Sequence, residues 1–157
     1  MDAPVPTALW LAAQAIPSIE VVAYEGAAHS GARWQITPLL YSFGVNRRTY
    51  PVRTFVVDPF ARQSGSIEAY VSPEVFSFGP ASGRLSLRLG TRAYFALISR
   101  GEYLSVSVGT SYSSFARGGV GYEAGAYVLF GLLGVQATYS PSPGAPPFIG
   151  TLSVRIF

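Results

Sequence analysis

Charged side chains recur at regular spacing in the second half of this 157-residue chain. Arg84, Arg88 and Arg92 are four residues apart, so in a β-strand their side chains point to one face. Carboxylates occur in the flanking segments. Buried charges of opposite sign persist when they form hydrogen-bonded ion pairs. The spacing therefore predicts an interior charge network, which consists of Glu68, Glu74, Arg84, Arg88, Arg92 and Glu123.

A histidine–serine pair is the second feature that could do chemistry. His29, the only histidine, is followed by Ser30 in a glycine-flanked stretch, with Glu25 nearby. A hydrolase needs its nucleophile and base within hydrogen-bond reach, but adjacent residues of a strand point to opposite faces. A solvated loop histidine is the favoured interpretation. One histidine without cysteine gives no metal-ligand spacing, so we expect no catalytic residues, no metal and no cofactor.

Composition restricts the class of protein. Hydrophobic residues make up 49% of the chain and charged residues 12%, about half the share of roughly 25% in soluble domains. No window approaches the roughly 18 consecutive apolar residues of a membrane helix. All 11 basic residues are arginine, and they are dispersed rather than gathered in a basic stripe. This dispersion argues against nucleic-acid binding.

Two-residue alternation identifies the elements that must position these side chains. Leu85, Leu87 and Leu89 alternate with polar residues, which is the period of a β-strand. Glycine, serine and proline clusters, including Gly26–Gly31, separate such runs. Eight strands are predicted, at about 18–25, 32–43, 66–78, 84–98, 102–115, 120–130, 133–140 and 148–157. Short connections make neighbouring strands antiparallel.

Two segments fall outside this pattern. Residues 1–17 lack the positively charged start of a signal peptide. We therefore expect this segment to be the N-terminus of a chain that has already been exported, and to form a short helix or plug. Residues 44–65 are predicted to be a long excursion between strands, because Pro51 and Pro59 bracket the short apolar run 52–57. The predicted barrel domain is 18–157.

The distribution of residue types over the two faces indicates a transmembrane barrel. One face is apolar and includes Ile36, Leu40 and Val108; the other carries glycine, serine and the charged residues. An arginine that points into lipid costs about 2–4 kcal/mol, so the arginines are assigned to the lumen. The fold class is thus all-β, an eight-stranded antiparallel up-and-down transmembrane β-barrel. A lipocalin-like soluble binder requires the opposite assignment.

The chain resembles the small eight-stranded outer-membrane proteins of Gram-negative bacteria, of the OmpA transmembrane-domain and OmpX type. The resemblance lies in size, strand count and the alternating last strand, and covers roughly residues 18–157. It implies an outer-membrane location, contact with membrane lipid and recognition by the barrel-assembly machinery. The implied assembly signal is Leu152, Val154, Ile156 and Phe157, although Phe157 has the opposite parity to the others.

The predicted function is structural: a membrane anchor or accessory component with a filled lumen, and not an enzyme. Residues 44–65 form either a local cap under the barrel or a docking surface for a periplasmic or membrane partner. The candidate docking residues are Arg47, Arg48, Arg53, Phe55 and Phe60. The alternatives are a pore for a small solute, an anion or a lipophilic molecule, and a lipid A-modifying enzyme that uses His29.

Overall fold

The computed structural model describes residues 12, 15–24, 26–44, 48, 51–77, 85–114, 118–142 and 148–154. Within them the strands close into one antiparallel eight-stranded barrel, accompanied by one short helix, and this confirms the predicted fold class. The strands are β1 (Ser18–Tyr24), β2 (Ala27–Arg33), β3 (Ile36–Ser42), β4 (Val52–Arg53), β5 (Ser66–Phe76), β6 (Leu85–Ile98), β7 (Leu104–Ser113), β8 (Gly119–Val128), β9 (Leu133–Tyr139) and β10 (Phe148–Val154).

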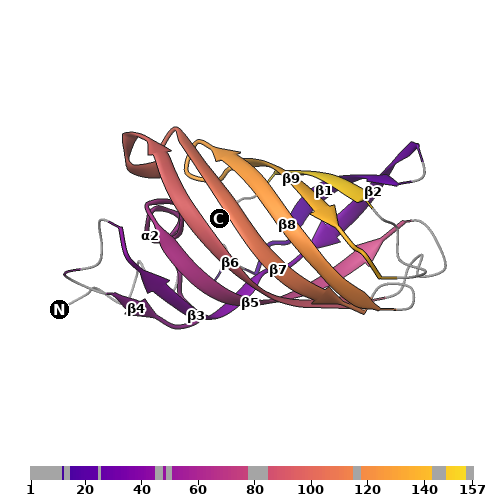
Figure 1. Ribbon diagram of the computed structural model, residues 1–157, viewed down its shortest axis with the longest axis horizontal. Helices are drawn as coiled ribbons and strands as arrows, with labels where there is room; N and C mark the ends of the chain where they lie inside the picture. Colours follow the sequence, from indigo (N-terminus) through magenta and orange to yellow (C-terminus); the bar gives the residue numbers. More distant parts are fainter. Residues whose placement is uncertain are drawn as a thin grey trace.

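The ten strand segments form eight walls. Segments β2 and β3 both pair with β5 and form one interrupted wall, and β4 adds two residues to the edge of β3. Each wall pairs with the next along the chain, and β10 closes the barrel by pairing with β1. Figure 1 shows the long strands β6, β7 and β8 crossing the barrel obliquely.

Pro73 in β5 causes the interruption between β2 and β3. The Trp34 amide donates to the Pro73 carbonyl at 3.0 Å, but proline has no N–H to return the bond. The Ser72 hydroxyl donates to the Trp34 carbonyl instead, at 2.8 Å. A lumen side chain therefore replaces the missing backbone donor, and the wall continues past the proline.

A register shift in β3 overturns one predicted face. The pairing of β3 with β5 shifts between Ile36 and Leu39, around Pro38. An extra residue in one strand reverses the parity of all that follow. Leu40, which strict alternation assigned to the outer face, is therefore buried inside with 0% exposure.

The first hairpin is tighter than predicted. The stretch Gly26–Gly31 was expected to be a turn, but β2 begins at Ala27, which pairs with Tyr24. The small residues of β2 have a weak intrinsic tendency to form a strand, but pairing with the valine-rich β1 outweighs this weakness. Gly26, with φ of +78°, supplies the left-handed turn position.

The two faces of the wall differ completely in charge. In β6 the outward residues Leu85, Leu87 and Leu89 are exposed, whereas Arg88 and Arg92 are buried. Apart from Arg53 in β4, every charged residue of the described strands is buried. The interior of this barrel is polar and its exterior is apolar.

One end of the barrel is covered by the helix α2 (Pro59–Gln63), which the sequence analysis did not predict. The Asp58 carboxylate caps it by accepting from the Ala61 amide at 2.7 Å, and Pro59 suits the first helical position. Residues Ala61, Arg62 and Gln63 are buried. No helix in the described part of the chain is long and apolar enough to cross a membrane. The end that holds α2 is called the plug end below (Figure 1).

The N-terminal segment that was predicted to be a helix or plug lies largely outside the described residues. Near its end, the Trp34 indole donates to the Ala15 carbonyl at 3.0 Å. The helix or plug expected in residues 1–17 therefore stays a prediction.

Three glycines hold the α2 segment closely at the plug end. A Cβ on Gly44 would lie 2.0 Å from the Ser64 carbonyl oxygen, and one on Gly101 would lie 2.2 Å from that of Gln63. A Cβ on Gly131 would meet the Gln63 amide nitrogen at 2.4 Å. Because these glycines come from three different connections, the helix is fixed to the barrel on several sides.

We expect Gly101→Ala to destabilise the barrel by about 1–3 kcal/mol more than Gly26→Ala, because only the first substitution overlaps the plug. Both glycines have positive φ, of +90° and +78°, but a Cβ at Gly26 meets nothing within 4 Å. The matched pair therefore separates steric overlap from backbone strain. Urea titration of the folded barrel measures the difference, and equal losses of stability would contradict the close fit of α2.

Candidate functional site

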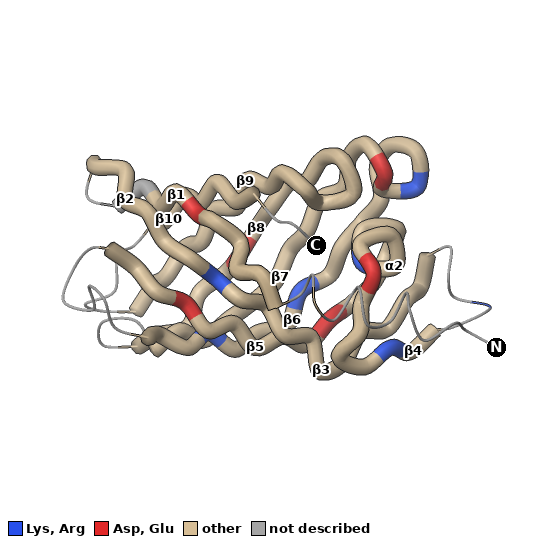
Figure 2. Tube along the Cα trace, turned by 180° about the vertical axis from the view of Figure 1, so that it is seen from behind, with Lys and Arg blue, Asp and Glu red and all other residues tan. Residues whose placement is uncertain are grey.

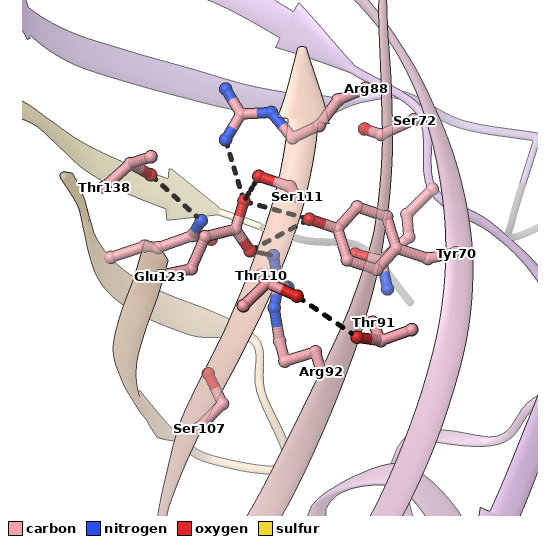
Figure 3. A network of polar contacts seen from close by, with 12 residues as sticks. Tyr70, Ser72, Arg88, Thr91, Arg92, Ser107, Thr110, Ser111, Glu123 and Thr138 are labelled. Carbon is pink, nitrogen blue, oxygen red and sulfur yellow. Dashed lines mark hydrogen bonds and ion pairs between the residues drawn. The ribbon is translucent and has the colours of Figure 1, made fainter. Parts of the chain in front are cut away.

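The centre of the lumen is organised around the carboxylate of Glu123 in β8. Arg88 Nη1 donates to its Oε1 at 3.0 Å and Arg92 Nη2 to its Oε2 at 2.5 Å. The Tyr70 hydroxyl lies 2.9 Å from both oxygens, and the Ser111 hydroxyl donates to Oε1 at 2.7 Å. Figure 3 shows these groups converging from β5, β6 and β7. The carboxylate is therefore surrounded by donors.

Small residues on the inner face make room for this cluster. A Cβ on Gly90 would lie 2.7 Å from the Tyr70 hydroxyl, and one on Gly109 would lie 3.3 Å from Arg92 Cβ. The Arg92 guanidinium lies 4.7 Å from the centre of the Tyr70 ring, a cation–π contact. Gly90 thus makes room for the Tyr70 ring and the Thr110 carbonyl, whereas Gly109 is required mainly by the Thr91 carbonyl oxygen of the neighbouring strand, 2.5 Å from such a Cβ.

An alternating series of ion pairs extends from Glu123 toward β1. Arg88 Nε lies 2.9 Å from Glu74 Oε1. Arg33 Nε lies 2.9 Å from the same Glu74 oxygen and 3.0 Å from Glu20 Oε1. Each buried carboxylate in this series faces at least one guanidinium, which offsets the cost of removing it from water.

A second acidic centre, Glu68, joins the helix α2 to the wall. Arg62 Nε donates to Glu68 Oε2 at 3.0 Å, and the Thr37 hydroxyl donates to the same oxygen at 3.0 Å. The Tyr94 hydroxyl donates to Oε1 at 2.9 Å and accepts from Arg92 Nη1 at 3.3 Å. The two acidic centres therefore belong to one network.

Arg62 enters the lumen from outside the strands. Burial is the largest single influence and acts to lower the pKa of its guanidinium, but Glu68 and Tyr94 together raise that pKa above its ordinary value. Arg62 therefore stays charged and ties α2 to β5. The adjacent Gln63 accepts a hydrogen bond from the Ser105 hydroxyl of β7.

The network is balanced in charge and densely packed. The buried charged residues of the described part are four acids and four bases, which sum to zero: Glu20, Glu68, Glu74, Glu123, Arg33, Arg62, Arg88 and Arg92. Figure 2 shows acidic and basic positions interspersed along the barrel. A cavity of about 20 Å³ lies beside Glu20, Arg33 and Gln136. It has room for about one water molecule.

Most of the residues predicted for the charge network lie in this lumen. Glu68, Glu74, Arg88, Arg92 and Glu123 are brought together, and Arg84 is outside the described residues. Glu68 is in register with Arg92 but forms its ion pair with Arg62. Sequence reasoning missed five members: Glu20, Arg33, Arg62, Tyr70 and Tyr94. Their inward parity could have identified those in the predicted strands, but nothing in the sequence placed Arg62 inside.

The candidate docking residues do not form one group in the described structure. Arg53 pairs with Asp58 at 2.6 Å, Phe60 is half-buried and Phe55 is 56% exposed. Arg48 is exposed, and Arg47 lies outside the described residues. Within the described residues of this segment, Ala61, Arg62 and Gln63 of α2 are buried at the barrel mouth, and the docking surface stays a prediction.

His29 and Ser30 lie on opposite faces of β2. His29 is in register with the buried Val22, whereas the exposed Ser30 hydroxyl donates to Ser77 Oγ at 3.2 Å. The described residues contain no group of three or more metal-ligating side chains. In β10, Leu152 and Val154 are exposed on the outer face, and Ile156 and Phe157 fall outside the description.

No protein-family model, curated protein or solved structure matches this chain. What the protein does must be inferred from its own residues.

We expect Glu123→Gln to destabilise the barrel by about 3–5 kcal/mol, because Arg88 and Arg92 lose the carboxylate that both of them contact. Ser111→Ala is the control. It removes one neutral donor to the same charged oxygen, a hydrogen bond that contributes about 1.5–3 kcal/mol. Free energies of unfolding from urea titration give both values, and a Glu123→Gln effect no larger than that of Ser111→Ala would contradict the central role of the carboxylate.

Proposed function

We propose that this protein is an outer-membrane β-barrel with a filled lumen that acts as a structural membrane anchor or accessory component. The observation that carries the proposal is the distribution of charge, with a paired polar interior inside an uncharged apolar exterior. Exposed apolar residues occur on all the long walls, for example Ile67 on β5, Leu85 on β6, Val108 on β7 and Val135 on β9. Such a continuous belt suits lipid rather than water.

The dimensions of the barrel support the same proposal. Strand β6 has 14 residues, which at roughly 3.3 Å per residue extends about 46 Å. At a tilt of about 40° it rises roughly 35 Å, enough to cross an apolar band about 25 Å tall. Strands β5, β7 and β8 have 11, 10 and 10 residues, near the length that a spanning strand needs.

The filled lumen favours an anchor over a pore. Ions need a continuous wet path, but paired side chains fill the centre and α2 covers one mouth of the barrel. A lipocalin-like binder needs an apolar cavity, whereas the lumen of this barrel holds eight charged residues. An accessory role then uses the surfaces at the two ends, with a periplasmic or membrane protein as partner, and assembly depends on the barrel-assembly machinery.

The proposal is tested by refolding the denatured chain with and without detergent micelles and comparing boiled with unboiled samples on a gel. We expect a compact, heat-modifiable band that appears only with detergent, and no conductance in planar bilayers. A monomer that folds in plain buffer would overturn the membrane assignment. Steady conductance by the folded barrel would overturn the anchor in favour of a pore.

A matched pair of arginine substitutions tests whether the apolar belt contacts lipid. Val108 is 53% exposed on β7, and Ala27 is exposed at the first hairpin. In lipid vesicles we expect Val108→Arg to destabilise the barrel by about 2–4 kcal/mol and Ala27→Arg by about 0–1 kcal/mol, since the cost of a charge falls toward the membrane surface. Urea unfolding from vesicles measures both, and similar small effects would argue that no lipid covers β7.

A further inference from the structure

Two connections at the plug end share an unusual backbone. Ser99, Arg100 and Gly101 join β6 to β7 with φ of +49°, +58° and +90°. Residues 129–131 join β8 to β9 in the same way, with φ of +52° at Leu129, +60° at Phe130 and +85° at Gly131. We call these segments the twin turns. A non-glycine residue in the left-handed region costs about 1–2 kcal/mol, so this shape needs support.

The support comes from α2 and from the turns themselves. Gly101 and Gly131 both pack against Gln63, one on its carbonyl and the other on its side-chain amide. The Phe130 amide donates to the Glu102 carbonyl at 2.8 Å, which joins one turn to the other. The twin turns are therefore joined into one tip that packs against α2.

The tip presents side chains that a water-facing turn does not need. Leu129 is 47% exposed, Phe130 40% and the neighbouring Tyr103 59%. Asn-Gly is the pair that such positive φ values favour, yet Leu-Phe and Ser-Arg occupy these positions. At the opposite end, the described residues that flank the connections include the small or polar Ala27, Ser77 and Ser114, together with the exposed Leu85, Tyr139 and Phe148. At the plug end, the apolar exterior thus continues over the turns themselves.

We propose that the twin turns are a lipid-interface anchor that holds the plug end in the headgroup layer of a phospholipid leaflet. Leu129 and Phe130 lie beneath the phosphates, and the Arg100 guanidinium binds a lipid phosphate. This proposal rests on the proposed membrane barrel. It adds the depth of the plug end in the bilayer and the contact between Arg100 and a lipid headgroup.

Continuity and charge both favour phospholipid as the occupant. The tip joins the apolar belt without a polar break, through Ile98 and Val128. Arg100 is exposed while Glu102 in the same connection is half-buried, so the cation is the outer charge. Guanidinium binds phosphate through paired hydrogen bonds, and aromatic residues are enriched at membrane interfaces.

The depth of the turns can be measured because the chain contains no cysteine. Three single-cysteine variants are made, Ser99→Cys, Ala27→Cys and Ala124→Cys, and each cysteine is labelled with a small fluorophore. Each labelled barrel is then refolded into vesicles of phosphatidylcholine and phosphatidylglycerol. Ser99 and Ala27 are exposed small residues at opposite ends, and Ala124 is exposed on the outer face of β8. We expect the Ser99 label to be quenched several-fold less by aqueous iodide than the Ala27 label, and to be quenched by a headgroup-attached nitroxide.

Each other outcome overturns a defined statement. A Ser99 label as open to iodide as the Ala27 label, while the Ala124 label stays protected, refutes the anchor and leaves the membrane barrel intact. If the Ala124 label is open to iodide, or if no heat-modifiable band forms, the assignment of the barrel to the membrane is refuted. A Ser99 label shielded from iodide but not quenched by the nitroxide means that protein covers the turns, which also refutes the anchor.

Variants of the tip separate lipid contact from folding. Leu129→Asn combined with Phe130→Gly supplies residues suited to the observed φ values, so the fold is retained. We expect this variant to keep the heat-modifiable band and to open the Ser99 label to iodide. Phosphatidylglycerol in the vesicles should increase the equilibrium constant for folding, and this increase is the gain that we compare. Arg100→Gln should reduce the gain about fivefold, and Arg100→Lys should retain most of it. An unchanged gain in Arg100→Gln would refute the phosphate contact.

Discussion

The structure depends on pairing the charges that a closed barrel has removed from water. A single buried carboxylate or guanidinium costs several kcal/mol unless a partner of opposite sign and further donors surround it. Glu123 meets this requirement with Arg88, Arg92 and two hydroxyl groups from three other strands. Because the partners come from three different walls, the network forms only when the strands are in the correct register. Charge pairing thus selects one arrangement of the barrel.

The distribution of side-chain size around the barrel follows from this pairing. The long acids and bases of β1, β2, β5 and β6 reach across the lumen, while β7 and β8 present mostly serine and glycine to it. Closer packing on one wall needs smaller residues on the wall opposite, since interiors are packed without large voids. The low hydrophobicity of these inner faces therefore does not weaken the fold. It provides the volume that the arginines fill.

Strict alternation was enough to predict the number of walls, the antiparallel order and the polar lumen, because period two assigns faces without knowledge of the partners. It failed where a local event changed parity or where the chain left the strands. Leu40 faces inward because the register shifts near Pro38, and nothing in the sequence specifies that shift. Arg62 was expected in an excursion outside the barrel, yet it pairs with Glu68. Five helical residues carry too weak a periodic signal to be recognised.

The plug links the interior network to the outer surface. Gln63 follows Arg62, so the ion pair that holds α2 against Glu68 also sets the residue that supports Gly101 and Gly131. The unfavourable backbone of the twin turns is therefore maintained by contacts whose stability comes from the lumen. The charge network of the lumen thus has a consequence at the surface, because it determines the shape of the tip at the plug end. The interior of the barrel therefore sets the geometry of its plug end.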